Sequence, residues 1–270
     1  MTTYLDHILV AHRETASLDG RLLEGLLDSA SSGEPPRGFI QALAGGTSDE
    51  IAVIAEVKRR SPSRGDLDTG LDPAIVAGQY ATGGAACLSV LTDESFFGGS
   101  AGDLRAARLA VDLPVLRKDF TVDARDVCDA RIMGADAVLL IVAALDDQEM
   151  ADFYALSTEL GMDTLVEVHD ESELERALVI GASLVGVNQR DLVTFEVDPG
   201  RATRMAPLIP EGVVRVAESG IKDKATAVAL KQAGYHALLV GESLVTAGDR
   251  AAAVRALCQS VGDRTAGDPD

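Results

Sequence analysis

An apolar stretch near residue 55 ends in two opposite charges. Residues 51–57 are largely apolar and β-branched and lie between turn signals, as in a fully buried strand, yet the stretch closes with Glu56 and Lys58. Residues two apart on a strand share a face, so these two side chains project the same way. Residues 59–65, RRSPSRG, combine cations, hydroxyls and chain breakers, which suits an oxyanion such as phosphate. Taken alone, the stretch fits a surface salt bridge and a solvated turn equally well.

Similar polar residues close four further apolar runs: Lys118, Glu167, Asn188 and Glu218. Each by itself is compatible with a strand-end side chain that meets solvent. Together with Glu56 and Lys58 they amount to two ammonium groups and three carboxylates, which can supply a paired acid and base if they face one cavity. We therefore ask which elements could bring them together.

From residue 51 onward, strand-like runs alternate with helix-like ones. The runs are 51–58, 86–91, 115–118, 137–142, 164–169, 184–188, 213–218 and 237–241, and the helical patterns include 73–81, 101–111, 124–133, 147–160, 172–180 and 224–232. Strands that are apolar on both faces and separated by helices indicate parallel pairing with right-handed crossovers. Eight such units predict a (β/α)₈ TIM barrel, in which the C-terminal strand ends form one mouth that carries the chemistry.

An internal repeat supports the barrel. A glycine that ends a helix precedes an apolar strand at Gly84, Gly134, Gly181 and Gly234, with a period of two βα units. These repeats fall on the even-numbered strands, which a barrel with alternating layers treats alike. A doubly wound open sheet also repeats βα units, but it does not require eight evenly spaced strands.

The first 45 residues carry no strand signal. Tyr4, Leu5, Ile8 and Leu9 recur at helical spacing, as do Leu22, Leu23, Leu26 and Leu27, and an apolar piece at 39–44 precedes the first strand. No linker-like segment divides the chain. We expect one barrel domain over residues 1–270, of which residues 1–45 form an N-terminal helical extension.

The charge excludes some function classes. Asp and Glu total 43 against 24 Lys and Arg, a net charge of −19, which repels nucleic acid and anionic membranes. Such a surface suits a high-salt, halophilic cytoplasm, although an ordinary acidic enzyme is the alternative. No membrane span or signal peptide is recognisable, and three distant cysteines argue against a disulfide framework or a metal site. We expect a cytoplasmic protein, a monomer or weak homo-oligomer.

Six ordered motifs carry a resemblance to a known family. EVKRRSPSRG at 56–65, LRKDF at 116–120, LVEVH at 165–169, GVNQRDL at 186–192, VAESGI at 216–221 and LVGESL at 239–244 resemble those of indole-3-glycerol phosphate synthases. YLDHIL at 4–9 is similar to that family's helical extension. The chain departs from the family at Gln189, where Asn or Ser is frequent, and at Arg60, where Lys or Ala is frequent; we interpret both as rim positions.

The resemblance implies ring closure of 1-(2-carboxyphenylamino)-1-deoxyribulose 5-phosphate with loss of carbon dioxide and water, without a metal or other cofactor. It assigns the general acid to Lys118 and the general base to Glu167. It also implies that Lys58 attracts the substrate carboxylate or acts as a second acid, that Glu56 orients an ammonium group, and that Asn188 and Glu218 hold the reacting hydroxyls and amine. The phosphorylated substrate would be bound through Ser61, Ser219, Gly220, Gly241 and Ser243.

Two alternatives remain at this point. A related phosphate-sugar barrel enzyme, such as a phosphoribosylanthranilate isomerase, would share the Gly and Ser phosphate site but should lack both the Glu56-Val57-Lys58 strand end and the N-terminal helical extension. A barrel that binds a phosphorylated ligand without turnover should lack Lys118 and Glu167. We also expect that a side chain added at Gly241 would obstruct the phosphate without touching the proton-transfer groups.

Overall fold

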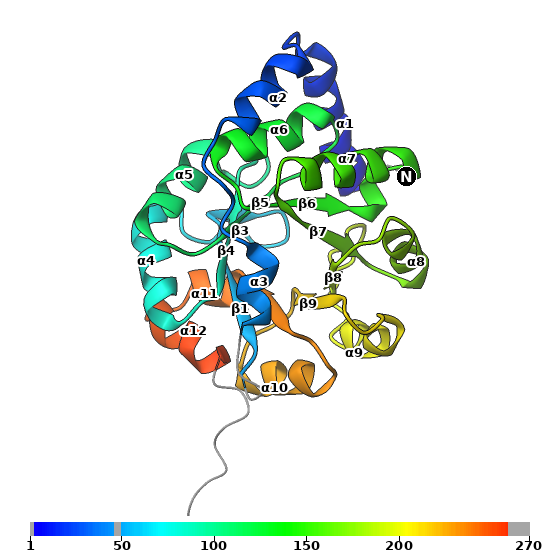
Figure 1. Cartoon of the computed structure of the whole chain (residues 1–270). Helices are drawn as coiled ribbons and strands as arrows, with labels where there is room; N and C mark the ends of the chain where they lie inside the picture. Colours follow the sequence, from blue (N-terminus) through cyan, green and yellow to red (C-terminus); the bar gives the residue numbers. More distant parts are fainter. Residues whose placement is uncertain (1–2, 46–49, 259–270) are drawn as a thin grey trace, which may run out of the picture.

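The computed structural model describes residues 3–45 and 50–258, and its centre is a closed barrel of eight parallel strands in the order β1-β10-β9-β8-β7-β6-β5-β4 (Figure 1). The predicted TIM barrel is confirmed, with each strand boundary within one residue of the expected position. The barrel strands are β1 Ala52–Val57, β4 Cys87–Leu91, β5 Val115–Lys118, β6 Ala137–Ile141, β7 Asp163–Val168, β8 Leu184–Asn188, β9 Val214–Glu218 and β10 Ala237–Val240.

Helices connect the strands and surround the barrel, as Figure 1 shows. They are α4 Pro73–Gly83, α5 Ala101–Ala110, α6 Ala124–Met133, α7 Asp147–Glu159, α8 Glu171–Val179, α9 Arg201–Met205, α10 Lys224–Gln232, α11 Glu242–Val245 and α12 Arg250–Cys258, with 3₁₀ turns η1 Val142–Ala144 and η2 Ala206–Leu208. Among the described residues, no helix has the length and apolar character needed to cross a membrane.

Local sequence signals set where these helices begin and end. The Asp123 side chain caps α6, and the N3 residue Asp126 bonds back to the backbone N–H of Asp123, forming a capping box. Gly84 and Gly134 end α4 and α6 in the left-handed conformation, both with φ of 94°. The glycine repeat predicted from the sequence therefore marks helix ends.

The core fills the inside of the barrel and the layer between strands and helices. Leu88, Leu116, Leu139 and Leu165, from four consecutive strands, are at most 1% exposed. Because both faces of each strand are covered, the strands are apolar throughout, and polar side chains are concentrated where they end.

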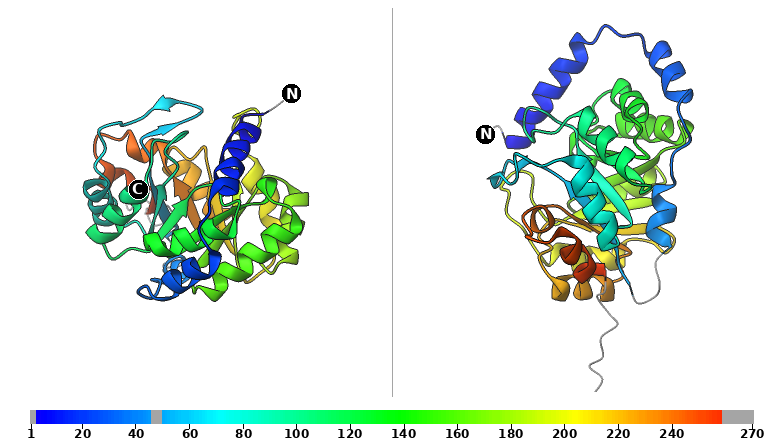
Figure 2. Two further views of the ribbon diagram at one scale, coloured as in Figure 1. Left: turned by 90° about the horizontal axis from the view of Figure 1, so that it is seen from above. Right: turned by 90° about the vertical axis from the view of Figure 1, so that its left-hand side faces the viewer.

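The N-terminal extension contains α1 Tyr4–Leu18, α2 Leu23–Ser31 and α3 Phe39–Ala44. Figure 2 shows α1 in blue rising on the same side of the barrel as the cyan hairpin of β2 Arg60–Ser61 and β3 Gly65–Asp66. α2 packs against α6, and α3 contacts β1, β4 and β9. The backbone N–H of Ile40 donates to Asp163, the first residue of β7, so α3 lies at the N-terminal end of the barrel, opposite α1.

Three short helices and the hairpin were not predicted. α9 has 5 residues and α11 has 4, too few to show a periodic pattern. α12, RAAAVRALC, distributes alanine around its whole surface and so lacks a clear apolar stripe. The three cysteines are free thiols, as expected: Cys87 and Cys128 are buried and Cys258 is partly exposed.

Candidate active site

A cavity of about 490 Å³ opens at the C-terminal ends of the strands. Its lining includes every site residue predicted from the sequence: Glu56, Lys58, Ser61, Lys118, Glu167, Asn188, Glu218, Ser219, Gly220, Gly241 and Ser243. The strand ends therefore bring together residues that are up to 187 positions apart (243 − 56). Tyr4, Leu5 and Ile8 of α1 close one side of the same cavity.

Lys118 and Glu167 form the centre of the site. Nζ of Lys118 donates to Oε2 of Glu167 at 3.0 Å and lies 3.9 Å from Oε2 of Glu218. Burial by itself lowers the pKa of Lys118, but the negative charges of Glu167, Glu218 and Glu56 outweigh it and raise the pKa above its ordinary value. Lys118 is therefore an ammonium group surrounded by carboxyl groups.

The two carboxyl groups near Lys118 differ in charge state. Burial favours the neutral form of Glu167, but Lys118 and the hydrogen bonds to this carboxylate lower its pKa well below the usual range. Nδ2 of Asn188 donates one of those bonds at 3.1 Å. Burial and the neighbouring Glu167 charge raise the pKa of Glu218 well above its usual value. The site thus holds an ionised carboxylate beside a carboxyl group that favours its protonated form.

The position of the Glu218 side chain explains why residue 186, on the neighbouring strand β8, is a glycine. Oε1 of Glu218 is buried without a hydrogen-bond partner among the described residues. A Cβ at Gly186 would lie 2.1 Å from this oxygen. Only glycine leaves room here for the carboxyl group.

At the end of β1, Nζ of Lys58 donates to Oε1 of Glu56, as their shared strand face predicts. We expected that a side chain added at Gly241 would not touch the proton-transfer groups, and this prediction is wrong. A Cβ at Gly241 would lie 2.3 Å from Oε1 of Glu56 and 3.1 Å from Nζ of Lys58. Because β10 pairs with β1, a side chain at this position meets the charged pair directly.

The loops after β9 and β10 also line the cavity. Ser219 and Gly220 follow β9 with φ of 66° and 73°, so both residues have the left-handed conformation. Oγ of Ser243 donates to the backbone oxygen of Ile221 at 3.0 Å. Gln189 is not a rim residue: it is 1% exposed, and its Nε2 donates to the Ser219 backbone oxygen at 2.8 Å.

Several lining residues were not predicted from the sequence. Phe97, Phe120, Leu192 and Arg190 come from loops that follow strands, and Lys222 comes from the loop before α10. A strand-end position is visible in the sequence, whereas a loop residue gives no periodic signal of the direction in which it points. The LRKDF motif does contain Phe120 two residues after Lys118, and that proximity is a signal that could have identified it.

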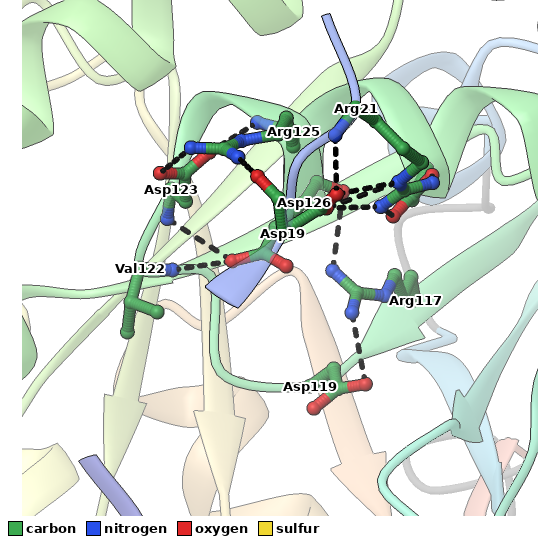
Figure 3. A network of polar contacts seen from close by, with 9 residues as sticks. Asp19, Arg21, Arg117, Asp119, Val122, Asp123, Arg125 and Asp126 are labelled. Carbon is green, nitrogen blue, oxygen red and sulfur yellow. Dashed lines mark hydrogen bonds and ion pairs between the residues drawn. The ribbon is translucent and has the colours of Figure 1, made fainter. Parts of the chain in front are cut away.

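A polar network fastens the extension beside the site (Figure 3). Arg117 donates to Asp119 at 3.0 Å and to the backbone oxygen of Asp126 at 3.2 Å, while Arg125 donates to the backbone oxygen of Asp19, just after α1. On α1 itself, Nε2 of His12 lies 3.0 Å from Oδ2 of Asp93.

His12, Asp93 and Asp119 offer ligand atoms within 4.8 Å of one another. Both Asp119 oxygens already accept hydrogen bonds, from Thr92 and Arg117 on one and from the backbone N–H of Phe120 on the other. We therefore interpret the group as an ion pair between α1 and the barrel.

Comparisons with known proteins agree with this geometry. Residues 7–257 match the family model described as indole-3-glycerol phosphate synthase. Curated proteins of that name from Nocardioides sp. (strain ATCC BAA-499 / JS614) and Paenarthrobacter aurescens (strain TC1) are 51% and 48% identical, over 91% and 90% of this chain and 92% and 91% of their own lengths. A thiamine phosphate pyrophosphorylase from Pyrococcus furiosus superposes with a TM-score of 0.57 at 15% identity, covering 77% of this chain and 93% of that one, a likeness of fold alone.

Proposed function

The chain belongs to the indole-3-glycerol phosphate synthase family, and from that membership we propose which of its residues carry the reaction. The enzyme closes the pyrrole ring of 1-(2-carboxyphenylamino)-1-deoxyribulose 5-phosphate, a carboxy-lyase reaction of tryptophan biosynthesis that releases carbon dioxide and water. Ring closure requires a proton donor at the substrate carbonyl, and the later dehydration requires a base. Lys118 is the proposed acid and Glu167 the proposed base.

The observation that supports this assignment is the 3.0 Å contact between Nζ of Lys118 and Oε2 of Glu167 inside the cavity. The raised pKa of Lys118 arises from its carboxylate neighbours, whereas burial alone lowers it. When a substrate carbonyl separates Lys118 from Glu167, the ammonium group loses its main stabilising partner and becomes a stronger acid. Glu167 is then left as an ionised base beside the substrate.

The remaining lining residues have supporting roles in the proposal. Lys58, held by Glu56, attracts the substrate carboxylate, and Asn188 and Glu218 hold the reacting hydroxyls and amine. Glu218 suits a hydrogen-bond donor role because its raised pKa favours the protonated carboxyl.

The substrate phosphate is bound by the loops that follow β9 and β10. Backbone N–H groups and hydroxyls of Ser219, Gly220, Gly241 and Ser243 bind it, with Ser61 on the β2–β3 hairpin reaching over the mouth. Ser61 is 9% exposed, and its Oγ has no hydrogen-bond partner among the described residues, which leaves it available for a ligand.

The proposal extends to the organisation of the whole chain. Residues 1–270 form one barrel domain with its helical extension, a monomer or weak homo-oligomer in the cytoplasm. The net charge of −19 supports weak association, since like-charged surfaces repel one another.

Two substitutions test the acid and the base separately. Lys118→Arg keeps the positive charge but cannot release its proton at working pH, so turnover should fall by about 10²- to 10⁴-fold while a product analogue still binds. Glu167→Gln keeps the shape and removes the base, so a ring-closed, still hydrated intermediate should accumulate in a single turnover. Indole fluorescence follows product formation, and quenched samples identify the intermediate.

Matched controls change the same residue types away from the cavity: Lys231→Arg on α10 and Glu175→Gln on α8 should behave as the parent protein. Parent-like turnover of Lys118→Arg would move the acid to Lys58. An unaltered rate in Glu167→Gln would move the base to Glu56.

A further inference from the structure

His169 follows β7 and lies between two carboxylates. Its Nδ1 is 2.9 Å from Oε2 of Glu173, an oxygen that also accepts from the His169 backbone N–H at 2.7 Å. Its Nε2 lies 3.4 Å from Oε1 of Glu167, an ion-pair distance, and makes no hydrogen bond in the described part of the chain. The side chain is 11% exposed. A buried ring nitrogen is thus directed at the proposed base.

The two contacts together determine the protonation state of the ring. An ionised carboxylate accepts hydrogen bonds and cannot donate them. A neutral imidazole carries one N–H, so it would turn an unprotonated nitrogen toward either Glu167 or Glu173. Only the imidazolium presents an N–H to both carboxylates.

We propose that His169 is a positioning residue for Glu167: held by Glu173 as an imidazolium, it presents its Nε2–H to Oε1 as an ion-pair partner and keeps the carboxylate in place and ionised. This inference rests on the proposed role of Glu167 as the base. His169 itself transfers no proton in the reaction.

The two carboxylate oxygens of Glu167 have different partners, so Glu167 can lose one partner during turnover and keep the other. Oε2 accepts from Lys118, and Oε1 faces Asn188 and His169. When Lys118 turns to the substrate carbonyl, His169 is the cation that remains against Glu167. The base therefore keeps its charge at the step that needs it.

The surrounding charges agree with this role. Burial lowers the pKa of His169, but its bonds to Glu167 and Glu173 outweigh burial and raise the pKa to about 9. The other polar groups around Glu167 come from neighbouring strands: Lys118 on β5, Asn188 on β8 and Glu218 on β9. On α8, the helix that carries Glu173, Asp170 is the N-cap. The η1 turn that packs on β7 and α8 contains only Val142, Ala143 and Ala144.

The pH profile of kcat tests the proposal with Glu173→Gln and His169→Gln. In the parent, kcat should fall above about pH 9 as His169 loses its proton, a value that follows from its carboxylate partners. Glu173→Gln removes one of those partners, so this fall should move to lower pH by about one unit or more. His169→Gln keeps a donor for Glu167 but cannot titrate, so the fall near pH 9 should disappear and kcat should be lower at neutral pH. KM should change little in both variants.

Glu175→Gln is the matched control, since Glu175 is an exposed glutamate on the same helix, and it should leave the profile unchanged. Adding Glu173→Gln to His169→Gln should have no further effect on the profile. NMR follows the protonation of the His169 ring without turnover. The ring signal is assigned by its absence in His169→Gln. The pKa of the ring should fall in Glu173→Gln and in Glu167→Gln.

Three outcomes are distinguishable. Parent-like profiles in Glu173→Gln and His169→Gln, with Glu167→Gln inactive, would overturn the positioning role and leave the proposed base intact. Activity in Glu167→Gln would overturn the assignment of the base. If His169→Gln does not fold, an unshifted ring titration in Glu173→Gln would still overturn the proposal.

Discussion

Nζ of Lys118 lies 3.0 Å from Oε2 of Glu167, so the proposed acid and the proposed base of one reaction are hydrogen-bonded to each other inside the barrel. The Glu167 side chain is 1% exposed and that of Lys118 is 16% exposed. In such surroundings each charge depends on the other for compensation. Breaking the pair proposed to perform the chemistry should therefore also destabilise the fold.

A double-mutant cycle measures that dependence. Lys118→Gln leaves the carboxyl groups of Glu167 and Glu218 without their cation, and removal of one partner of a buried pair costs about 3–5 kcal/mol in the free energy of unfolding. The double variant Lys118→Gln with Glu167→Gln should lose less than the sum of the two single losses. Urea unfolding at neutral pH gives these free energies. Additive losses would mean that the two groups do not stabilise each other.

The Glu218 carboxyl predicts a pH-dependent stability. Its pKa in the folded protein is raised by burial and by Glu167, so its contribution to stability is present below the unfolded value, about 4.3, and is lost as pH rises through the folded value. Glu218→Gln mimics the neutral form at every pH. The variant should match the parent near pH 4 and exceed it increasingly as pH rises, in urea unfolding at several pH values. A variant that is less stable than the parent at pH 8 would show that Glu218 is ionised in the folded protein.

The barrel can be predicted from the sequence because the pattern of each strand depends on its own few residues. A strand covered on both faces must be apolar along its length, so the strands and their polar ends are visible one segment at a time. Once eight parallel strands are expected, closure of the barrel brings Lys58, Lys118, Glu167 and Glu218 to one mouth, as observed.

Other features depend on neighbours that are distant in sequence. The opposite pKa shifts of Glu167 and Glu218 follow from their neighbours: Lys118, His169 and Asn188 lower the pKa of Glu167 against the effect of burial, whereas burial and the Glu167 charge raise the pKa of Glu218. The approach of Gly241 to Glu56 depends on the pairing of β10 with β1. Leu22 and Leu23 belong to a set of leucines at helical spacing, yet they are 80% and 40% exposed. Periodicity predicts a helix but does not show which of its residues another element covers.

The ion pair of His12 predicts that α1 is held less firmly at high pH. Burial lowers the pKa of His12, but Asp93 and Asp119 outweigh it and raise the pKa above its usual value. The stabilisation is complete below the unfolded value, about 6.5, and is lost as pH rises through the folded value. Hydrogen exchange of the α1 amides should therefore speed up, relative to the intrinsic rate, as pH rises from 6 to 9.

His12→Gln should abolish this pH dependence, whereas His7→Gln, an exposed position on the same helix, should retain it. The idea fails if α1 exchange in the parent, corrected for the intrinsic rate, is the same at both ends of the pH range.

The acidic surface predicts that salt stabilises the protein. At a net charge of −19, the negative groups on the surface repel one another in dilute buffer. Salt screens this repulsion, because the Debye length falls from about 30 Å at 0.01 M to about 3 Å at 1 M ionic strength. Tm should rise steadily from dilute buffer to 1 M sodium chloride, and sucrose of equal osmolarity serves as the uncharged control. Full stability in dilute buffer, or loss of structure on adding salt, would contradict the high-salt hypothesis.

The last prediction separates phosphate binding from proton transfer. Gly241 is a poor position for this purpose, because its added Cβ would meet Glu56 and Lys58. Ser219 and Ser243 line the cavity from the loops that follow β9 and β10. A hydrogen bond to a charged group contributes about 1.5–3 kcal/mol, so Ser219→Ala should weaken inhibition by inorganic phosphate about tenfold or more. Ser243→Ala should weaken it less, because the Ser243 hydroxyl must give up its bond to the Ile221 backbone oxygen before it can donate to phosphate. KM should rise with it, and kcat should change less because Lys118 and Glu167 are untouched.

Gly241→Ala is the informative comparison. It should lower kcat through the Glu56–Lys58 pair, as well as raising KM, because the backbone of β10 cannot move away from β1 without breaking their pairing. Competition between inorganic phosphate and substrate in steady-state assays gives the inhibition constants, and circular dichroism verifies that each variant is folded. Equal phosphate inhibition of the parent and both serine variants would place the substrate phosphate away from the loops that follow β9 and β10.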